Sequence, residues 1–430
     1  MNPKQARQRQ SSSSRILPAK LLRFQNNRAA HRGRPFLAIA MGGEVRILFI
    51  NHVFPGQFGT LAASFARNTE NEVFFMSGYS RRGFSLQGVK QIILPTLRDK
   101  KKNEKTDLST EAEKVLRTAR QARKSFFLLR QNGFRPDMVV LNAAWAYWLY
   151  GPEIFPDAFV VSYLETFPNP APCEDHFNAD FFQTLLQTRQ ILLSHLCISR
   201  TLGEESPYAQ TLRTAVALPY PVDTEFFSPQ IGEELWADPE SPIVFVSTVA
   251  ESLDHLLMMT CTVLTRLPKR RISLLISDAK LRGRAKEKLQ YKDLGSEQRL
   301  SLPEAMPLRE YRNLLRTAAA VVFADSRPRS DFLLEAMSCG AVAILCSTTD
   351  LPEVFQHGWN IIKLEQQDLT TQLESLLLNH IFLRELRLHA RDTILKHFSH
   401  GEVIEKHTAL IESTYKKWCK NRYASNVSPE

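Results

Sequence analysis

Residues 318–364 read AAAVVFADSRPRSDFLLEAMSCGAVAILCSTTDLPEVFQHGWNIIKL, and this stretch decides the fold. It begins with an apolar run at 318–323, which is short and rich enough in β-branched residues to predict a buried strand. A polar loop follows, and then a helix that starts near Phe332 and stops at Gly340. A second apolar strand at 341–346 completes a strand–loop–helix–strand unit, which is typical of a parallel α/β sheet.

The beginning of the predicted helix carries polar side chains that can serve a ligand. We expect Ser330 or Asp331 to be its N-cap and Glu335 to lie in about its first turn. A further short helix is expected to open at 351–354. In parallel α/β sheets, ligands lie at the carboxyl ends of the strands, against helix N-termini. Glu335 is therefore expected to be within reach of a bound ligand.

The length of 430 residues and the apolar fraction of 43% are sufficient for two domains of ordinary size. The net charge of +10 is concentrated at the beginning of the chain, where residues 1–40 hold nine Lys and Arg residues and no acidic residue. The remaining 390 residues hold 46 basic and 45 acidic residues. The body of the protein is therefore nearly neutral.

Three interpretations of residues 1–40 remain open. The favoured one is a disordered basic arm or an upstream extension, with Met41 just before the first strand as the functional start. A transit peptide is an alternative, because the segment is rich in Arg and Ser and lacks acidic residues. Nucleic-acid binding is the least favoured, since no aromatic residues are interleaved with the charge.

The six cysteines are spread widely and show no CxxC spacing, so a zinc site or a redox pair is not expected. Unpaired thiols fit a reducing compartment such as the cytoplasm. The chain contains no run of 18 or more apolar residues, and we therefore expect no membrane-spanning helix.

The first half of the chain starts like a nucleotide-binding crossover. The pattern predicts a strand at 45–50, a loop at 51–59, a helix at 60–67 and a strand at 72–76. The loop lacks a GxGxxG motif, and Gly56 with Gly59 is a weak signal. Gly56 either makes a simple tight turn or lets the backbone approach a phosphate or a sugar.

A long amphipathic helix is predicted at 110–131, with basic residues along one face: Lys114, Arg117, Arg120, Arg123, Lys124 and Arg130. The favoured interpretation is a surface helix that packs on the sheet. Alternatively, its basic face contacts anionic lipid at a membrane surface or a phosphorylated acceptor.

Two further strands of the first half end in polar or aromatic side chains. A strand at 136–141 is followed by Asn142 and Trp145, and a strand at 158–163 is followed by Glu165. Polar groups at such strand ends line the ligand site of this architecture. Asn142 and Glu165 are therefore candidate catalytic residues, together with Glu335.

The second half repeats the alternation of strands and helices after a polar region at 230–241, which is the best domain boundary. Strands are predicted at 243–247, 272–276, 299–302, 321–324 and 342–346. We expect a first domain at 41–228, a second at 240–400, and a last helix at 402–420 that crosses back onto the first domain.

Four segments together resemble the family 4 glycosyltransferases of the GT-B type, and more closely a bacterial subgroup with an FPGQF-like N-terminal loop. The segments are the strand and loop at 46–58, Arg135-Pro136-Asp137 before a strand, the linker at 222–227, and residues 333–340 with 351–354 and 358–360. The resemblance covers about residues 45 to 415, and the last segment is the most specific of the four.

The resemblance implies two Rossmann-like domains with parallel sheets that face each other across a cleft. It also implies transfer of a sugar, with retention, from a nucleotide diphosphate-sugar to a glycan or lipid-linked acceptor, in cell-surface polysaccharide synthesis. The second domain would hold the donor, and the first would hold the acceptor. Glu335 matches the second glutamate of the family's E-x7-E motif, which holds the donor ribose. No cofactor is implied, and the chain has no Asp-x-Asp pair for a metal.

The sequence departs from the family pattern at the phosphates of the donor. Arg327 stands where the first glutamate of the motif is expected, and residues 246–254 carry no basic side chain where a glycine-arginine and a lysine usually clamp the diphosphate. Arg327 and Arg329 are candidates to supply the missing charge beside Ser330 and Asp331. Lys280 or Arg282 could also supply it.

Two functions therefore remain open. The favoured one is an active, metal-independent glycosyltransferase of the cytoplasm or the inner face of the membrane. The alternative is a catalytically silent GT-B protein that keeps the fold for binding a partner. A nucleotide-sugar epimerase is disfavoured, since it would need more acid and base residues at the cleft.

Overall fold

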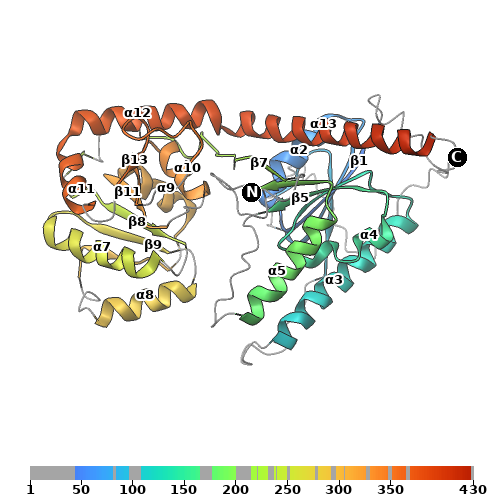
Figure 1. Ribbon diagram of the computed structural model, residues 1–430, viewed down its shortest axis with the longest axis horizontal. Coiled ribbons are helices and arrows are strands. Elements are labelled where there is room, and N and C mark those ends of the chain that lie inside the picture. The colour runs from blue at the N-terminus through green and yellow to red at the C-terminus, as the bar shows by residue number, and fades with distance from the viewer. Residues whose placement is uncertain are drawn as a thin grey trace, which may run out of the picture. The chain divides into compact units, whose positions relative to one another are not determined.

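The computed structural model (Figure 1) describes most of the chain from Glu44 onward. The described residues are 44–80, 84–95, 108–164, 177–199, 215–219, 221–230, 237–238, 240–248, 252–276, 279–291, 297–304, 306–325, 330–346, 351–364 and 369–427. The chain divides into two compact units. The first contains residues up to Ile198, with 213–216 and 407–430, and the second contains 199–212 and 217–406.

The first unit is built on a sheet whose described strands follow the order β3-β2-β1-β4-β5-β6-β7. The strands are β1 (Arg46–Phe54), β2 (Glu72–Ser80), β3 (Val89–Ile93), β4 (Met138–Asn142), β5 (Phe159–Leu164), β6 (Leu196–Ser199) and β7 (Ala215–Ala217). The central strand β1 pairs in parallel with β2 on one side and with β4 on the other. Its residues from Ile47 to Ile50 are apolar and buried, as expected of a parallel strand that is covered on both faces.

Helices cover both faces of this first sheet. They are η1 (Gly56–Phe58), α2 (Gly59–Arg67), α3 (Leu108–Gln131), η2 (Ala146–Trp148), α4 (Gly151–Ile154), α5 (Phe177–Leu192) and α13 (His400–Val427). Figure 1 shows α3, α4 and α5 on one face and α2 with the end of α13 on the other. Phe126 and Leu129 of α3 are fully buried against Leu48 and Phe74, so the apolar face of this helix packs on the sheet.

The second unit repeats the plan with a sheet whose described strands follow the order β10-β9-β8-β11-β12-β13. The strands are β8 (Ile243–Ser247), β9 (Ile272–Ile276), β10 (Leu300–Ser301), β11 (Ala320–Phe323), β12 (Ala343–Leu345) and β13 (Ile362–Lys363). The helices are α7 (Leu253–Arg266), α8 (Ala279–Tyr291), α9 (Leu308–Thr317), α10 (Ser330–Ser338), α11 (Leu369–Leu378) and α12 (His380–His397).

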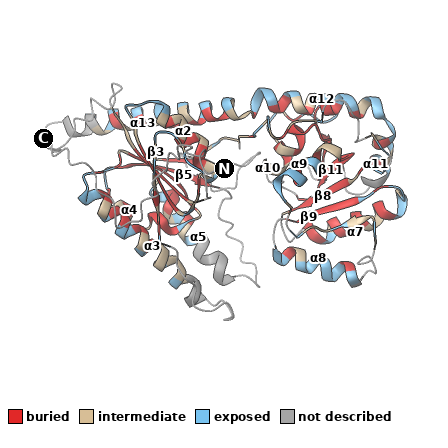
Figure 2. Ribbon diagram, turned by 180° about the vertical axis from the view of Figure 1, so that it is seen from behind, coloured by how far each residue is buried: buried red, intermediate tan, exposed pale blue. Residues whose placement is uncertain are grey.

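Two apolar clusters lie against the second sheet. One gathers residues of α7, α8 and α11, and the other gathers residues of α9 and α10, while α12 contributes to both. Strands β8, β11 and β12 between them are buried along their length, as Figure 2 shows for β8. The two clusters explain why the described part of 318–346 is so rich in alanine, valine and leucine, because most of these side chains are buried in a packed layer.

Both sheets are doubly wound, which fixes where a ligand is expected. In each order the first strand of the sheet stands between the second and the fourth, so the direction of winding reverses beside it. The reversal lies between β1 and β4 in the first unit and between β8 and β11 in the second. Crevices for ligands form at the carboxyl ends of the two strands at such a switch point.

The predicted α/β fold with two Rossmann-like sheets is confirmed, and so is the long C-terminal helix. The end of that helix belongs with the first unit, because residues from His407 onward cluster there. No helix in the described ranges is long and apolar enough to cross a membrane. The cysteines Cys197, Cys339, Cys346 and Cys419 are buried free thiols.

Some predicted boundaries were wrong. The first strand does not end at residue 50, because its pairing with β2 continues to Val53 and Phe54, and His52 is therefore a strand residue. The expected helix at 351–354 is a turn, closed by the bond from the Phe355 N–H to the Pro352 carbonyl. Helix α10 begins at Ser330, so Asp331 lies inside its first turn and Glu335 in its second.

Candidate functional site

A histidine and a tyrosine join the two strands at the switch point of the first unit. His52 lies near the end of β1, and Tyr147 lies in η2, which follows β4. The His52 Nδ1 and the Tyr147 hydroxyl are 2.7 Å apart, which is a hydrogen bond. The His52 ring also stacks on Trp145, with 4.2 Å between ring centroids. The His52 ring is therefore held by a hydrogen bond to Tyr147 and by stacking on Trp145, at the place where a ligand crevice is expected.

Tyr147 is a neutral hydrogen-bonding partner at ordinary pH. The residue is buried, and burial raises its pKa to about 12. Gly78 of β2 makes room for the pair, because a Cβ there would lie 2.5 Å from the Tyr147 hydroxyl and 3.2 Å from the His52 Nδ1. Trp145 keeps 39% of its surface exposed, so one aromatic residue of the group faces outward.

The candidates Asn142 and Gly56 lie near this group but have structural roles of their own. Asn142, which is 3% exposed, accepts a hydrogen bond from the Ala144 N–H at 2.9 Å and so closes the turn after β4. Gly56 has a φ of +47°, and a Cβ there would lie 2.5 Å from the Asn51 side-chain nitrogen. The backbone therefore requires glycine at position 56 whether or not a ligand is bound. Glu165 lies outside the described residues.

A buried carboxylate joins the two strands at the switch point of the second unit. Asp325 lies just after β11 and is 1% exposed. Its Oδ2 accepts hydrogen bonds from the Thr248 N–H at 2.8 Å and from the Thr248 hydroxyl at 2.7 Å. Its Oδ1 accepts a hydrogen bond from the Ser252 hydroxyl, at the start of α7. Asp325 therefore bridges the carboxyl end of β8 and the helix that follows it.

Glu335 lies on α10, the helix that follows β11, and burial together with its carboxylate raises the pKa of Tyr311 and of Cys339. Burial and then the Glu335 carboxylate raise the pKa of Tyr311 on α9. Burial also raises the pKa of Cys339, one helical turn after Glu335, to about 12. Glu335 is itself only partly buried, so its carboxylate stands at the rim of an apolar layer with solvent still within reach.

The predicted cations could not be placed together around this carboxylate. Arg327 and Arg329 lie outside the described residues, and the side chain of Ser330 does too. Arg282 is at the start of α8, where it donates a hydrogen bond to the Ile276 carbonyl at 2.7 Å and so caps the end of β9. Asp331 is on the first turn of α10. Over the ranges that the structure describes, no group of three His, Cys, Asp or Glu side chains could hold a metal ion.

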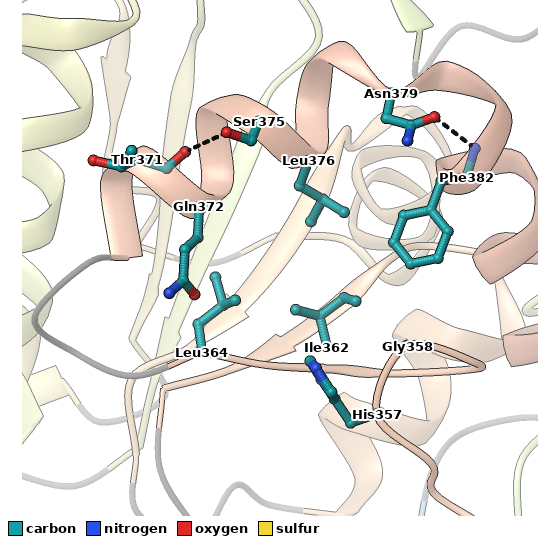
Figure 3. Close-up of a pocket in the computed structure, with 10 residues that line it drawn as sticks. All are labelled: His357, Gly358, Ile362, Leu364, Thr371, Gln372, Ser375, Leu376, Asn379 and Phe382. Atoms are coloured by element: carbon teal, nitrogen blue, oxygen red, sulfur yellow. Dashed lines mark hydrogen bonds between the residues drawn. The ribbon is translucent and has the colours of Figure 1, made fainter.

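A cavity of about 400 Å³ in the second unit lies away from the switch point of its sheet (Figure 3). It is at the outer edge of the second sheet, between the edge strand β13 and helix α11, with Phe382 of α12 at one side. Its described lining is mainly apolar and uncharged, and His357 is the one titratable residue in it. The described lining offers hydroxyl and amide groups but no Lys or Arg side chain for a diphosphate, so we place the candidate site at the switch points instead.

Sequence reasoning missed His52, Tyr147 and the role of Asp325. His52 and Tyr147 are 95 positions apart, and only the pairing of β1 with β4 brings them together. The available signal was their position, because each follows an apolar strand of the same predicted sheet.

Comparison with known proteins agrees with this architecture. The family described as "Glycosyl transferase family 4 group" matches residues 69–206, and the one described as "Glycosyl transferase-like" matches residues 259–408. No curated protein sequence matches the chain.

Solved structures similar to this one include three bacterial proteins. Sucrose-phosphate synthase from Thermosynechococcus elongatus is 14% identical, with a TM-score of 0.65, over 86% of this chain and 99% of that one. Anabaena HepE in complex with UDP and glucose is 12% identical, with a TM-score of 0.60, over 86% and 100%. A glycosyltransferase from Rickettsia africae is 11% identical, with a TM-score of 0.57, over 86% and 98%.

These similarities extend over both units, and the doubly wound sheets are those of the GT-B fold. Together with the two matched families, they identify the chain: it belongs to the family 4 glycosyltransferases of the GT-B type.

Proposed function

We propose that the protein is a retaining glycosyltransferase that moves a sugar from a nucleotide diphosphate-sugar to a glycan or lipid-linked acceptor in cell-surface polysaccharide synthesis. The observation that carries the proposal is the position of Glu335, on the helix after β11 at the switch point of the second sheet. Support comes also from Anabaena HepE, a structure of similar fold that was determined with UDP-glucose.

In this proposal the second unit binds the donor. The Glu335 carboxylate accepts hydrogen bonds from the two ribose hydroxyls, a role for which a carboxylate has enough lone pairs. The diphosphate lies near the beginning of α10, around Ser330 and Asp331, with Arg327 and Arg329 as its cationic partners. These charges stabilise the leaving group as the bond to the sugar breaks.

The first unit binds the acceptor. Asn142, Glu165 and Gly56 are the residues proposed from the sequence, and the His52–Tyr147 pair and Trp145 add a polar and aromatic surface beside them. An exposed indole ring suits the apolar face of a sugar, and the imidazole can hydrogen-bond a hydroxyl. Donor and acceptor would then each use the switch point of one sheet.

Calorimetric titration tests the donor half of this proposal. UDP, GDP and ADP are titrated into the wild type and into Glu335→Ala, with Glu310→Ala, an exposed residue of α9, as the matched control. We expect one diphosphate to bind the wild type and the control alike, and Glu335→Ala to bind it about tenfold or more weakly, since charged hydrogen bonds are lost. Equal affinities for all three proteins would contradict the role of Glu335.

The alternative of a catalytically silent protein is separated by donor hydrolysis. An active enzyme slowly hydrolyses its donor when no acceptor is present, whereas a silent one leaves the donor intact. Absence of nucleotide release from UDP-glucose, GDP-mannose and ADP-glucose, together with absence of any thermal shift, would favour the silent protein. Activity that persists in a chelator would support the metal-independent mechanism.

A peripheral contact with anionic membrane is proposed for α3. Arg123 lies 5.2 Å from the Phe127 ring and 5.5 Å from the Tyr150 ring, and Phe127 is 39% exposed. Exposed aromatic and basic side chains together suit the lipid–water interface, and would hold the protein at the cytoplasmic face of the inner membrane. Vesicles with anionic lipid should sediment the wild type, and Arg120→Glu/Arg123→Glu should abolish this while Lys416→Glu/Lys417→Glu on α13 does not.

A further inference from the structure

The switch point of the second unit is the place where a phosphate is expected, and the chain already occupies it with a carboxylate of its own. Ligand phosphates in doubly wound sheets lie at the carboxyl end of the first strand, where they receive N–H groups from the loop and the beginning of the next helix. In this protein those elements are β8, Thr248 and α7. The Thr248 N–H, the Thr248 hydroxyl and the Ser252 hydroxyl all donate hydrogen bonds to Asp325.

The hydrogen bonds show which described donors at this switch point Asp325 uses. A backbone N–H and a hydroxyl of Thr248 both point at one carboxylate oxygen, at 2.8 and 2.7 Å. The Ser252 hydroxyl points at the other oxygen and is 2.7 Å from the Ser247 hydroxyl. These are the kinds of donor that bind a phosphate oxygen, and Asp325 is 1% exposed, so its carboxylate stays in place.

The charge at this place has a second consequence. Helix α7 spans Leu253–Arg266, and its positive N-terminal dipole is offset by a negative charge close to its first turn. The donors that Asp325 uses among the described residues, Thr248 and Ser252, are all uncharged. A diphosphate that approached the same point would meet a like charge at short range in a weakly solvated site, and this repulsion is costly.

We infer that Asp325 is a specificity-determining residue that removes the contribution of the diphosphate to donor binding at this switch point. The inference rests on the proposed function, in which the second unit binds a nucleotide-sugar. The cations proposed above, Arg327 and Arg329, then only offset the repulsion from Asp325. The base and the ribose carry most of the affinity, through contacts such as the one proposed for Glu335. A nucleoside should bind this protein almost as tightly as the corresponding nucleoside diphosphate.

Asp325→Asn is a suitable test because an asparagine side chain can make hydrogen bonds to the same partners as Asp325. The amide oxygen can accept both hydrogen bonds from Thr248, and the amide nitrogen can donate to Ser252, whose hydroxyl can turn to donate to Ser247. The variant removes the charge and keeps the shape. Asp254→Asn is the matched control, because Asp254 is an exposed acidic residue in the first turn of the same helix and is 78% exposed at its side chain.

The experiment is calorimetric titration of the three proteins with uridine and UDP, guanosine and GDP, and adenosine and ADP. For the base that binds, we expect the wild type and Asp254→Asn to prefer the diphosphate over the nucleoside by less than about threefold. Asp325→Asn should bind the diphosphate about tenfold more tightly than the wild type and the nucleoside equally well, because one like charge has been removed.

Two results would overturn the inference, and they differ in what they say of the proposed function. A wild type that prefers the diphosphate by more than about threefold, or an Asp325→Asn protein with the same preference as the wild type, contradicts the inference alone. Absence of binding of every nucleoside and nucleotide to all three proteins contradicts the proposed function, and the inference with it. Asp325→Ser provides a second uncharged variant if the melting temperature of Asp325→Asn falls below the assay temperature, and the same criteria apply to it.

Discussion

Single residues at the ends of the central strands make the contacts that join neighbouring elements at each switch point. In the first unit, the hydrogen bond between His52 and Tyr147 joins the end of β1 to the helix that follows β4. In the second unit, the hydrogen bond between Asp325 and Thr248 joins the end of β11 to the end of β8. The same fold position therefore holds an imidazole and a phenol in one unit and a carboxylate in the other.

The hydroxyl of Tyr147 should contribute measurably to stability. Tyr147→Phe keeps the buried ring and removes the hydrogen bond to His52, and we expect the free energy of unfolding to fall by about 1 kcal/mol. Urea denaturation followed by circular dichroism measures it. Tyr150→Phe, next to the same helix, is the control and should leave the midpoint unchanged; a Tyr147→Phe protein as stable as that control would show that the bond contributes nothing.

Sequence reasoning proposed some candidate residues and overlooked others for a physical reason. Glu335 was predicted from its local motif, and the structure places it on the helix expected to carry it. Asp325 has no local signature, because its meaning depends on Thr248, which is 77 positions away. Contacts between strands that are distant in the sequence become visible only when the order of the strands is known.

Helix α12 depends on a cap and on one arginine. Asn379 is the N-cap, and its side chain accepts a hydrogen bond from the Phe382 N–H at 3.1 Å. Near the other end, Arg391 donates to the carbonyls of Thr224, Phe227 and Ser338, at 2.8 Å each. The arginine thus ties α12 to the end of α10 and to the segment that precedes the second sheet.

The cap of α12 can be tested by itself. Asn379→Ala should lower the free energy of unfolding of the second unit by about 1 kcal/mol, because one N–H of the first turn loses its partner. Asn379→Asp should retain the stability, since aspartate is an equally good N-cap. Thermal denaturation of the three proteins gives the comparison, and equal midpoints for alanine and aspartate would refute a capping role.

The Arg391 contacts predict a larger effect. Arg391→Met retains much of the aliphatic stem but leaves the three carbonyls without this donor, and we expect a loss of about 3 kcal/mol. The stability of Arg391→Lys should lie between those of the wild type and Arg391→Met, because an ammonium group cannot reproduce the planar guanidinium group. Chemical denaturation at neutral pH measures the series, and a methionine variant within 1 kcal/mol of the wild type would contradict the prediction.

The whole molecule should lose stability at alkaline pH. Burial raises the pKa of Cys346 and Cys339 from 9.0 to about 12, and that of Tyr147 from 10.0 to about 12. As the pH rises above 9, the unfolded chain releases these protons before the folded chain does, so unfolding becomes more favourable up to about pH 12. Each group contributes about 1.4 kcal/mol per pH unit within its window.

Urea midpoints between pH 7 and pH 11 measure this slope. Cys346→Ala should start from a lower stability, because a buried side chain is truncated, but its stability should fall less steeply above pH 9. Parallel curves for the variant and the wild type would show that the Cys346 thiol does not cause the alkaline loss.

At the scale of the whole fold, the repeating apolar strands predicted both sheets and their parallel winding. The sequence could not predict β13, because its pairing spans only Ile362 and Lys363, which is too short for a periodic signal. It also could not predict that β1 extends to Phe54, since that extension depends on bonds to β2. Local pattern predicts where strands exist, and pairing decides where they end.

The buried thiols make the two units separately observable. Cys197 and Cys419 belong to the first unit, while Cys339 and Cys346 belong to the second. A thiol reagent can reach each cysteine only when the surrounding structure opens, so the rate of alkylation at each position reports the local opening of the protein there. Mass spectrometry of the labelled peptides would then show which unit opens first. It would also show whether a bound nucleotide lowers the alkylation rate in one unit only.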